Sequence, residues 1–523
     1  MLDSLDRCSQ PAVVDSSSFA QSSLVGADCS AILGLSALCF LMFLPVVVWT
    51  PGWYGDDGGY MHMLNYFMGT GKVDLMHWSQ PAAFGVLIIA SLVAKIIGGG
   101  FLQFDFIGLL FTTCACCGAY TLARHHVEPR LSFLIAISIF CFNEVVLVAP
   151  TFMTDMPFLA YTIWWLVFTQ EIVAKPKIQL WKYFAWSSFL VLALMTRSTI
   201  LLAMPGFLVS LLFCPVQRKR LLVLTALFTV TVIVGAAITH SVSINQMSLL
   251  DVTSLRQIFV SHDFAMFDIR AAVVAGLSVM FAGSPLLMGV KQTNKELRPV
   301  QICTALVALG LSLYFSMKGH FQPLNPLLTP LVVCCVGVAA FNLPLFVAAA
   351  IGKNRTLSVI LISCITLQFA VMPIMAHPLT RHAIPVMVML TTLIAIANLS
   401  TLRAQRISFL LALALILNNL VGLQSVRLIN FAERELGLGL IQEGIKPQDI
   451  DAGWGWFCYY GLTPGRQDGL SYQERYEKWQ RDAKFFIGPA QGVEKPDLLV
   501  ARLPVNYLSD KCNLCVIQRR SVH

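Results

Sequence analysis

The chain has 523 residues, of which 57% are hydrophobic and only 12% are charged, and its mean hydropathy is +0.71. This composition excludes a soluble globular protein and predicts an integral membrane protein. The net charge of +8 does not indicate nucleic-acid binding, because most of the basic residues lie in short loops between apolar segments. In such loops they fix the orientation of a membrane protein.

Apolar stretches of membrane-spanning length recur along most of the chain. About 17 to 25 residues are needed to cross a hydrocarbon layer of ~30 Å as a helix. The sequence has 13 apolar stretches of roughly this length: 31–49, 104–122, 131–149, 157–173, 181–196, 199–214, 221–240, 271–290, 299–316, 326–350, 356–374, 383–400 and 407–424. The sequence therefore predicts an all-α polytopic membrane protein with about 13 transmembrane helices.

The charges of the loops predict the orientation. The apolar run 82–98 is placed along the interface, because counting it as a span would move the basic turn 124–130 to the opposite side. The basic loops then share one side, which the positive-inside rule makes cytoplasmic. Their residues are Arg124, Arg130, Lys175, Lys177, Lys182, Arg218, Lys219, Arg220, Lys291, Lys295, Arg298, Lys353, Arg355, Arg403 and Arg406.

Three parts follow from this topology. Residues 1–30 are a polar, Ser-rich cytoplasmic segment without the pattern of a cleaved signal peptide. Residues 31–426 form the membrane domain, whose first outer loop, 50–103, contains two amphipathic stretches that can lie on the outer leaflet. Residues 427–523 are polar enough, and long enough, to form a small domain on the outer face.

The C-terminal part is rich in aromatic residues. They are Trp454, Trp456, Tyr459, Tyr460, Tyr472, Tyr476 and Trp479. Such side chains can stack on sugar rings, but at this density they more often form a compact core or rest on the membrane surface. In the same part, Cys458, Cys512 and Cys515 would face an oxidising compartment, where they form one disulfide or none.

Three aspartates stand out at predicted membrane borders. Asp56 and Asp57 lie in a Gly-rich stretch after the first span, and Asp155 precedes the fourth. Carboxylates at such positions usually face water, a partner or a substrate, because burying a charge at membrane depth is costly. Each also has a structural explanation, since Asp is a common residue at helix N-termini and turns.

Four motifs in a fixed order connect these aspartates with basic residues. They read Asp56-Asp57-Gly-Gly-Tyr60, Thr154-Asp155-Met156-Pro157, Thr196-Arg197 and Arg381-His382-Ala383-Ile384-Pro385. Their order and sidedness over residues 30–425 resemble the GT-C membrane glycosyltransferases. The layout is most similar to the bacterial aminoarabinose transferases and protein O-mannosyltransferases. The resemblance implies a GT-C fold and transfer of a sugar from a polyprenyl-phosphate donor to an acceptor hydroxyl or phosphate.

The resemblance also implies roles for residues and a location. Asp56, Asp57 and Asp155 would be catalytic, with Asp56 as the base that takes the proton of the acceptor hydroxyl. Arg381 and Arg197, aided by Lys318 and His320, would bind the donor phosphate. Tyr60 and His382 would contact substrate. The site and the C-terminal domain would lie on the outer face of a bacterial plasma (inner) membrane, with lipids around the body and a glycan, lipid or protein as acceptor.

A metal requirement is left open by one departure from the family pattern. Several relatives have Glu-Lys-Pro-Pro before the interfacial helix, with the Glu implicated in metal binding, whereas this chain reads Ser79-Gln80-Pro81-Ala82. No cofactor is therefore firmly expected. A divalent metal ion, if used, would have to be held by the three aspartates with His77.

Two other classes of function remain open. A transporter or flippase of lipid-linked sugars would also need acids and cations facing outward in a lipid-sized cavity. Against it, the sequence has no long internal repeat and no acidic residue in the middle of a span, features that many transporters show. The third possibility is a scaffold whose C-terminal part binds partners, and it predicts that alanine is tolerated at all three aspartates.

Overall fold

The structure is a computed structural model. It describes residues 21–51, 56–73, 83–175, 178–242, 269–287, 296–318, 329–372, 380–398, 402–461, 472–489, 498–506 and 511–518. His77 and His320 lie outside these ranges.

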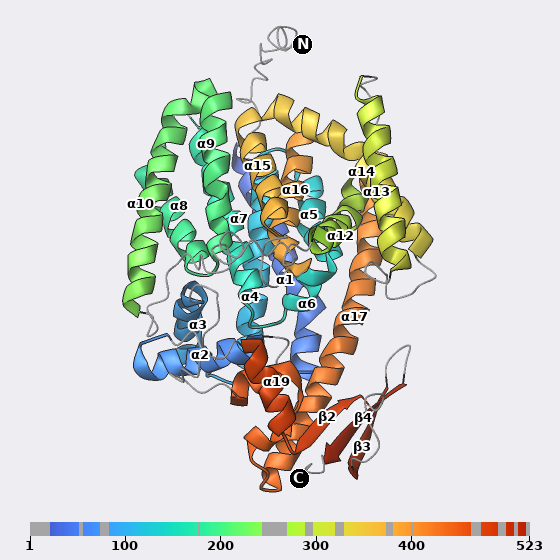
Figure 1. Cartoon of the computed structure of the whole chain (residues 1–523). Coiled ribbons are helices and arrows are strands. Elements are labelled where there is room, and N and C mark those ends of the chain that lie inside the picture. The colour runs from blue at the N-terminus through green and yellow to red at the C-terminus, as the bar shows by residue number, and fades with distance from the viewer. Residues whose placement is uncertain are drawn as a thin grey trace, which may run out of the picture.

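The membrane body is a bundle of helices that run roughly parallel to one another (Figure 1). Its helices are α1 (Gln21–Trp49), α4 (Phe101–Arg124), α5 (Pro129–Ser138), α6 (Asn143–Val148), α7 (Asp155–Ala174), α8 (Leu180–Leu194), α9 (Ala203–Phe213), α10 (Arg218–Val242), α12 (Ile269–Leu287), α13 (Arg298–Met317), α14 (Thr329–Lys353), α15 (Arg355–Val371), α16 (Ile384–Ala397) and α17 (Leu402–Gln442). Short 3₁₀ turns join some of them: η3 (Ile139–Cys141), η4 (Ser198–Leu202), η5 (Pro215–Gln217) and η9 (Thr380–Ala383).

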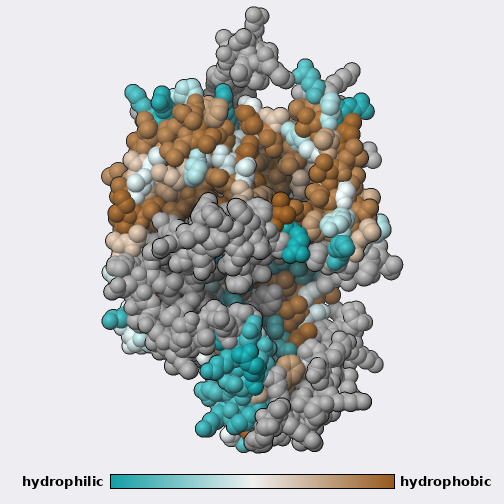
Figure 2. All heavy atoms as spheres, in the orientation of Figure 1, coloured by the Kyte–Doolittle hydropathy of each residue, from teal (hydrophilic) through white to brown (hydrophobic). Residues whose placement is uncertain are grey.

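The body has the apolar surface of a multi-pass membrane protein. Among the described residues, seven helices are long and apolar enough to cross a membrane: α1, α4, α10, α12, α13, α14 and α17. On the face that Figure 2 shows, hydrophobic side chains cover the upper part of the body, with hydrophilic residues above them and in the C-terminal part below. Large apolar side chains of α10, α13 and α17 are exposed on this surface, as lipid-facing residues should be.

Each of the predicted spans coincides, over its described residues, with a helix or a pair of helices. Several of these helices are too short to cross a membrane by themselves. The stretch 131–149 is divided into α5 and α6 by η3, and the stretch 199–214 consists of η4 followed by α9. The count of about 13 spans therefore stays a prediction.

The first predicted outer loop contains two helices, α2 (Asp57–Thr70) and α3 (Phe84–Ile97). They correspond to the two predicted amphipathic stretches. Figure 1 shows α2 lying across the direction of the bundle helices. The N-terminal end of α3 is fixed to the bundle, because Gly85 donates its N–H to the carbonyl of Met195 and accepts a hydrogen bond from the Tyr161 hydroxyl.

The C-terminal part is joined to the body by α17, which runs without interruption past the predicted boundary at residue 427. Its other elements are η10 (Pro447–Asp449), β1 (Ile450–Asp451), α18 (Gly453–Trp456), the π-helical turn η11 (Phe457–Gly461), α19 (Tyr472–Asp482), β2 (Phe485–Pro489), β3 (Leu498–Asn506) and β4 (Lys511–Gln518). The strands form one sheet in the order β1-β2-β4-β3. The body is all-α as predicted, whereas this small sheet was not predicted.

The aromatic residues of this part form a core, one of the alternatives that the sequence left open. Trp456 is fully buried, and Tyr459, Tyr460 and Trp479 pack around it. Cys458 is buried. Because Cys512 and Cys515 lie in β4 with side chains that the structure does not describe, a disulfide in this part stays a prediction.

Candidate functional site

Asp56 and Arg381 form an ion pair between segments that lie far apart in the sequence. The Arg381 guanidinium donates from Nη2 to Asp56 Oδ2 over 2.6 Å. Asp56 occupies the N-cap position of α2, yet its side chain makes no capping hydrogen bond. The carboxylate is therefore directed at the cation and not at its own helix, so simple capping does not explain it.

Asp155 and Arg197 form a second pair. Nη1 of Arg197 lies 2.8 Å from Asp155 Oδ1, and only 9% of the Arg197 side chain and 1% of the Asp155 side chain are exposed. Asp155 is the first residue of α7, and its side chain was predicted either to cap that helix or to act in the site. The side chain pairs with Arg197 and is no helix cap, and its predicted catalytic role stays a prediction.

Thr154 connects the two pairs. Its hydroxyl shares a hydrogen bond of 3.3 Å with the Tyr60 hydroxyl and accepts another of 3.3 Å from Nε of Arg197. Tyr60 belongs to α2, the helix that follows Asp56. Arg381 is held from the α7 side as well, since its Nη1 contacts the sulfur of Met153 at 3.7 Å. The paired cluster, defined as Asp56, Tyr60, Thr154, Asp155, Arg197 and Arg381, thus joins four segments of the chain.

The charges of the paired cluster influence one another. Burial alone would lower the pKa of Arg381, but Asp155 and Asp56 outweigh it and hold that pKa above its usual value. Burial, with Arg197 and Arg381 nearby, lowers the pKa of His382 well below its ordinary value, so this imidazole is neutral near pH 7. Burial and then the Asp56 charge raise the pKa of Tyr60, which keeps the phenol protonated.

Breaks in the bundle helices place the two arginines. The helix α8 ends at Leu194, and Arg197 is extended, with φ −152° and ψ 132°, before η4 begins. Arg381 lies in η9, directly before α16. Both residues are therefore at helix ends on the side where α7 begins.

A glycine that the sequence analysis did not single out supports the segment before Asp155. Gly108 of α4 faces Thr151 so closely that a Cβ at Gly108 would collide with the Thr151 carbonyl. Thr112, one helical turn further along α4, donates to the carbonyl of Ala149 over 2.8 Å. In the sequence, these two residues are only a glycine and a threonine within an apolar helix, which does not predict either contact.

The other predicted site residues have different positions. Asp57 is buried in the first turn of α2, where the helix dipole stabilises a carboxylate. His382 is buried, and its backbone carbonyl accepts a hydrogen bond from Gln368. Lys318 is exposed at the end of α13. Within the described residues, the Lys318 side chain makes no hydrogen bond or ion pair with the paired cluster. His320 lies outside those residues.

The described residues do not assemble a metal site. Within the ranges given above, no group of three His, Cys, Asp or Glu side chains is placed to hold a metal ion. Asp56 and Asp155 each face a guanidinium, which is a poor arrangement for a cation. Because His77 is outside the described residues, its predicted role in metal binding stays a prediction.

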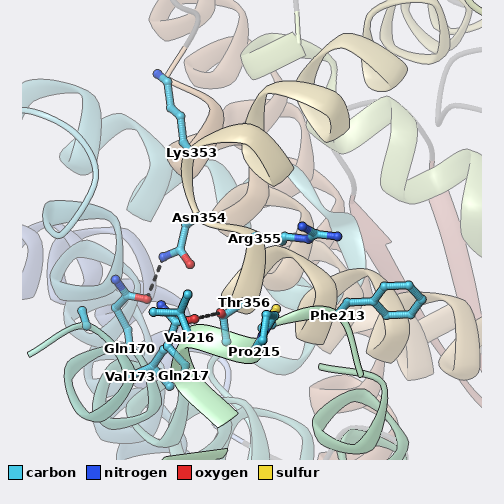
Figure 3. A pocket seen from close by; sticks show the side chains of 12 residues that line it. Gln170, Val173, Phe213, Pro215, Val216, Gln217, Lys353, Asn354, Arg355 and Thr356 are labelled. Atoms are coloured by element: carbon cyan, nitrogen blue, oxygen red, sulfur yellow. Dashed lines mark hydrogen bonds between the residues drawn. The ribbon is translucent and has the colours of Figure 1, made fainter. Parts of the chain in front are cut away.

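A pocket among the described residues lies away from the paired cluster. It has a volume of about 420 Å³ and is formed where α7, η5 and the turn between α14 and α15 meet. Figure 3 shows Asn354 pointing toward Gln170, and Thr356 toward Gln217, with a hydrogen bond in each pair. This pocket contains no carboxylate and lies at the end of α7 opposite to Asp155, so it is not part of the paired cluster.

A much smaller pocket, of about 20 Å³, lies beside the cluster. It is enclosed by Phe158 and Thr162 of α7, Ile200 of η4, Gln368 of α15 and Met389 of α16, among others. Its volume suffices for about one water molecule.

No protein-family model matches the chain, and no curated protein sequence matches it. Two kinds of solved structure are similar to it. ArnT from Cupriavidus metallidurans bound to undecaprenyl phosphate is 13% identical with a TM-score of 0.42, over 96% of this chain and 99% of that chain. The archaeal oligosaccharyltransferase AglB from Archaeoglobus fulgidus, in complex with an inhibitory peptide and a dolichol-phosphate, is 13% identical with a TM-score of 0.49, over 88% and 69%.

ArnT and an oligosaccharyltransferase are proteins of the kind that the sequence motifs resemble. The identities are far below 25% and both TM-scores are below 0.5. The likeness therefore carries nothing further about the substrates or the site residues of this chain.

Proposed function

We propose that this chain is a membrane glycosyltransferase that moves a sugar from a polyprenyl-phosphate donor to an acceptor hydroxyl, with Asp56 as the base. One observation carries the proposal: two Asp–Arg pairs, one buried and one partly buried, meet at one end of the bundle and are joined through Tyr60 and Thr154. Removing charged groups from water is costly unless they are paired or used. An apolar body ending in fixed cations suits a substrate that combines a lipid with a phosphate.

Arg381 and Arg197 are the groups proposed to bind the donor phosphate. Guanidinium groups suit phosphate because they offer several N–H donors in a fixed plane and stay charged at any physiological pH. The two cations are in place before negative charge develops on the leaving group, which is the condition for electrostatic stabilisation of a transition state. Lys318 is too exposed and too poorly connected to the cluster to be included.

Asp56 is proposed as the base because 18% of its side chain is exposed, compared with 1% for Asp155. In the reaction, the acceptor oxygen forms a bond to the anomeric carbon while its proton passes to Asp56. The bond from that carbon to the phosphate oxygen breaks, and its electron pair stays on the phosphate. The products are the glycosylated acceptor and a polyprenyl phosphate.

Asp155 is proposed to position Arg197 and not to touch substrate. Its carboxylate is buried against that guanidinium, while Thr154 holds Nε of the same side chain. The neutral imidazole of His382 and the protonated phenol of Tyr60 remain as candidate contacts to sugar hydroxyls. This assignment divides the three predicted catalytic aspartates into one base, one positioning residue, and Asp57 with no separate role in the step.

We propose further that the chain crosses the membrane about 13 times, with the paired cluster and the C-terminal part on the outer face. Asp155 is the first residue of α7, and the basic loop after Ala174 follows the last. The paired cluster and a basic loop therefore lie at opposite ends of this helix, which supports the proposed orientation. Cysteines introduced at Lys484 and Lys175, both exposed, should react with an impermeant thiol reagent from outside and from inside, respectively. The unsubstituted chain provides the background from its native cysteines.

The function is tested with purified protein and a panel of radiolabelled polyprenyl-phosphate sugars offered with cell-envelope glycans, lipids and proteins. We expect transfer by the native chain and a loss of at least about 100-fold in Asp56→Asn, the usual size of a general-base effect. Donor binding should persist. Asp449→Asn is the matched control, because Asp449 lies in the C-terminal part and pairs with the exposed Lys484.

Two outcomes would contradict this function. Donor binding without transfer to any acceptor, with Asp56→Asn behaving like the native chain, would support a transporter of lipid-linked sugars. Full transfer activity in Asp56→Asn would remove Asp56 from the chemistry.

A further inference from the structure

The helix α2, which begins directly after Asp56, has a second partner besides the bundle. It packs on α18 and η11 of the C-terminal part. We infer that the aromatic shelf, defined as residues 456–460, holds α2 at the position from which Asp56 contacts Arg381 and Tyr60 contacts Thr154. In this inference Tyr459 is a positioning residue for Asp56 and Tyr60. The consequence for catalysis rests on the proposed function, whereas the mechanical role of the shelf does not.

Two opposite faces of α2 contact its two partners. Tyr60 and His62 are two residues apart, so they point to nearly opposite sides of a helix with 3.6 residues per turn. The Tyr60 hydroxyl meets Thr154 in the paired cluster. The His62 ring meets the Tyr459 ring edge to face, with centroids 6.4 Å apart and planes at 88°. The helix is therefore held between the site and the shelf.

A helix of this length needs such support. The helix α2 has 14 residues, which is close to the length below which an isolated helix is marginal in water. Phe457 and Cys458 of the shelf belong to the same buried core as Met61, Met63 and Leu64 of α2. The shelf thus contributes part of the apolar surface that stabilises α2.

The shelf itself is fixed from two other directions. The buried Trp456 ring lies against α17 at Gly437, where a Cβ would approach the ring to 2.5 Å, and its indole N–H donates to the carbonyl of Pro447. Phe457 packs on Trp479 of α19 with ring centroids 5.7 Å apart. Because α17 continues into the membrane body, the position of α2 is tied to the bundle by two routes.

Small displacements of α2 should affect the reaction. Asp56 and Tyr60 act only if the carboxylate lies within hydrogen-bond reach of the acceptor, and a misplacement of about 1 Å can cost roughly 100-fold in rate. Removing the Tyr459 ring should therefore lower kcat by about 10-fold or more while leaving donor binding unchanged. Tyr459→Phe keeps the ring and should restore the rate.

The experiment measures hydrogen exchange of residues 57–70 in the full chain, together with binding of a polyprenyl phosphate and transfer kinetics. Variants are Tyr459→Ala, Tyr459→Phe and Tyr314→Ala, the last removing an exposed aromatic ring of α13. Of these three variants, only Tyr459→Ala should show faster hydrogen exchange in α2. Its exchange in α7 should be unchanged, and its affinity for polyprenyl phosphate should stay within 2-fold of the native value. His62→Ala approaches the same contact from α2 and should reproduce the effect, which decides the matter if Tyr459→Ala unfolds.

Unchanged exchange of α2 in Tyr459→Ala, or in His62→Ala where the first variant unfolds, would overturn the inference. An equal loss of rate in Tyr314→Ala would do the same. If the native chain transfers no sugar, the exchange measurement still decides whether the shelf holds α2. Failure of the proposed function is thereby distinguished from failure of this inference.

Discussion

Oδ2 of Asp56 cannot receive a hydrogen bond from an acceptor hydroxyl while it is occupied by the Arg381 guanidinium, which lies 2.6 Å away. A donor phosphate bound to Arg381 would compete for the same N–H groups and release the carboxylate. We therefore predict ordered binding, with the donor first and the acceptor second.

Initial rates measured while both substrates vary, with product inhibition by a polyprenyl phosphate, test this order. The product should compete with the donor and not with the acceptor. Tight acceptor binding to the donor-free enzyme would contradict the prediction. Arg381→Lys keeps the charge but loses the paired donors, and we expect it to weaken donor binding by about 10-fold or more, as for a lost charge-assisted hydrogen bond.

Thr154 provides a second test at the scale of one side chain. Its hydroxyl meets both Tyr60 and Nε of Arg197. Thr154→Val removes the hydroxyl at nearly constant volume, and a lost hydrogen bond to a charged group costs about 1.5–3 kcal/mol. We expect a fall of about 10- to 100-fold in kcat/KM. Thr154→Ser keeps the hydroxyl and should stay close to the native rate; equal rates in the two variants would exclude the connecting role.

Between elements, the close approach of α4 to the segment before Asp155 depends on Gly108. A methyl group there meets the backbone carbonyl of Thr151, which cannot move aside as a flexible side chain would. Gly108→Ala should destabilise the protein by about 1–3 kcal/mol through overpacking and should also lower activity. At Gly310 of α13, no neighbouring atom lies within 4 Å of the position that a Cβ would take. Gly310→Ala is therefore the matched control and should be neutral or stabilising.

Thermal unfolding in detergent and the transfer assay, applied to both glycine variants, measure these effects. Equal melting temperatures for the two would show that the contact at Gly108 is loose.

The helices α4 and α17 are also joined by a buried ion pair, in which Arg427 donates to Asp105 with both side chains essentially inaccessible. Removing one partner of such a pair leaves an uncompensated charge and typically costs about 3–5 kcal/mol. Asp105→Asn and Arg427→Met should each lower the melting temperature strongly. The exposed pair of Lys484 with Asp449 should be worth under about 1 kcal/mol, so Lys484→Met is the control. A small fall in melting temperature for both Asp105→Asn and Arg427→Met would show that the Asp105 site is hydrated.

For the whole molecule, the sequence predicted on which side of the membrane the charged residues of the paired cluster lie, but not the contacts that join them. Hydropathy and loop charge placed Asp56, Asp155, Arg197 and Arg381 on one side of the membrane, and the structure brings them together in two pairs. Their family motifs were visible because charges are rare in so apolar a chain. The roles of Thr154 and Gly108 depend on contacts with distant segments, which hydropathy along the chain does not contain.

Other differences have equally specific reasons. The strands β3 and β4 were not predicted because their apolar residues are interrupted by Arg502, Pro504 and Asn513, so the polar composition dominated. Lys318 was grouped with the site by its side of the membrane, which does not fix a position around the bundle, so its role in phosphate binding stays a prediction. Asp105 and Arg427 each stand at the end of an apolar stretch, and their pairing depends on how α4 and α17 pack together.

The stability of the whole molecule should depend on pH through His126, in the turn between α4 and α5. Burial, followed by the charges of His125 and Lys353, lowers its pKa to about 4, compared with an ordinary value of 6.5. Between these values the unfolded chain binds the proton and the native chain does not, so stability falls as the pH is lowered from about 6.5 to 4. Below pH 4 the loss reaches at most about 3 kcal/mol, and above about pH 7 it vanishes.

Melting temperatures of the native chain and of His126→Gln, measured in detergent from pH 4 to pH 8, test this dependence. The two curves should coincide at pH 7–8 and diverge on acidification, with the variant the more stable, because only the native chain has to bury or expel a charge there. The acidic groups that titrate in both proteins cancel in the difference. Parallel curves would mean that the His126 imidazole is hydrated and takes up its proton without opposing the fold.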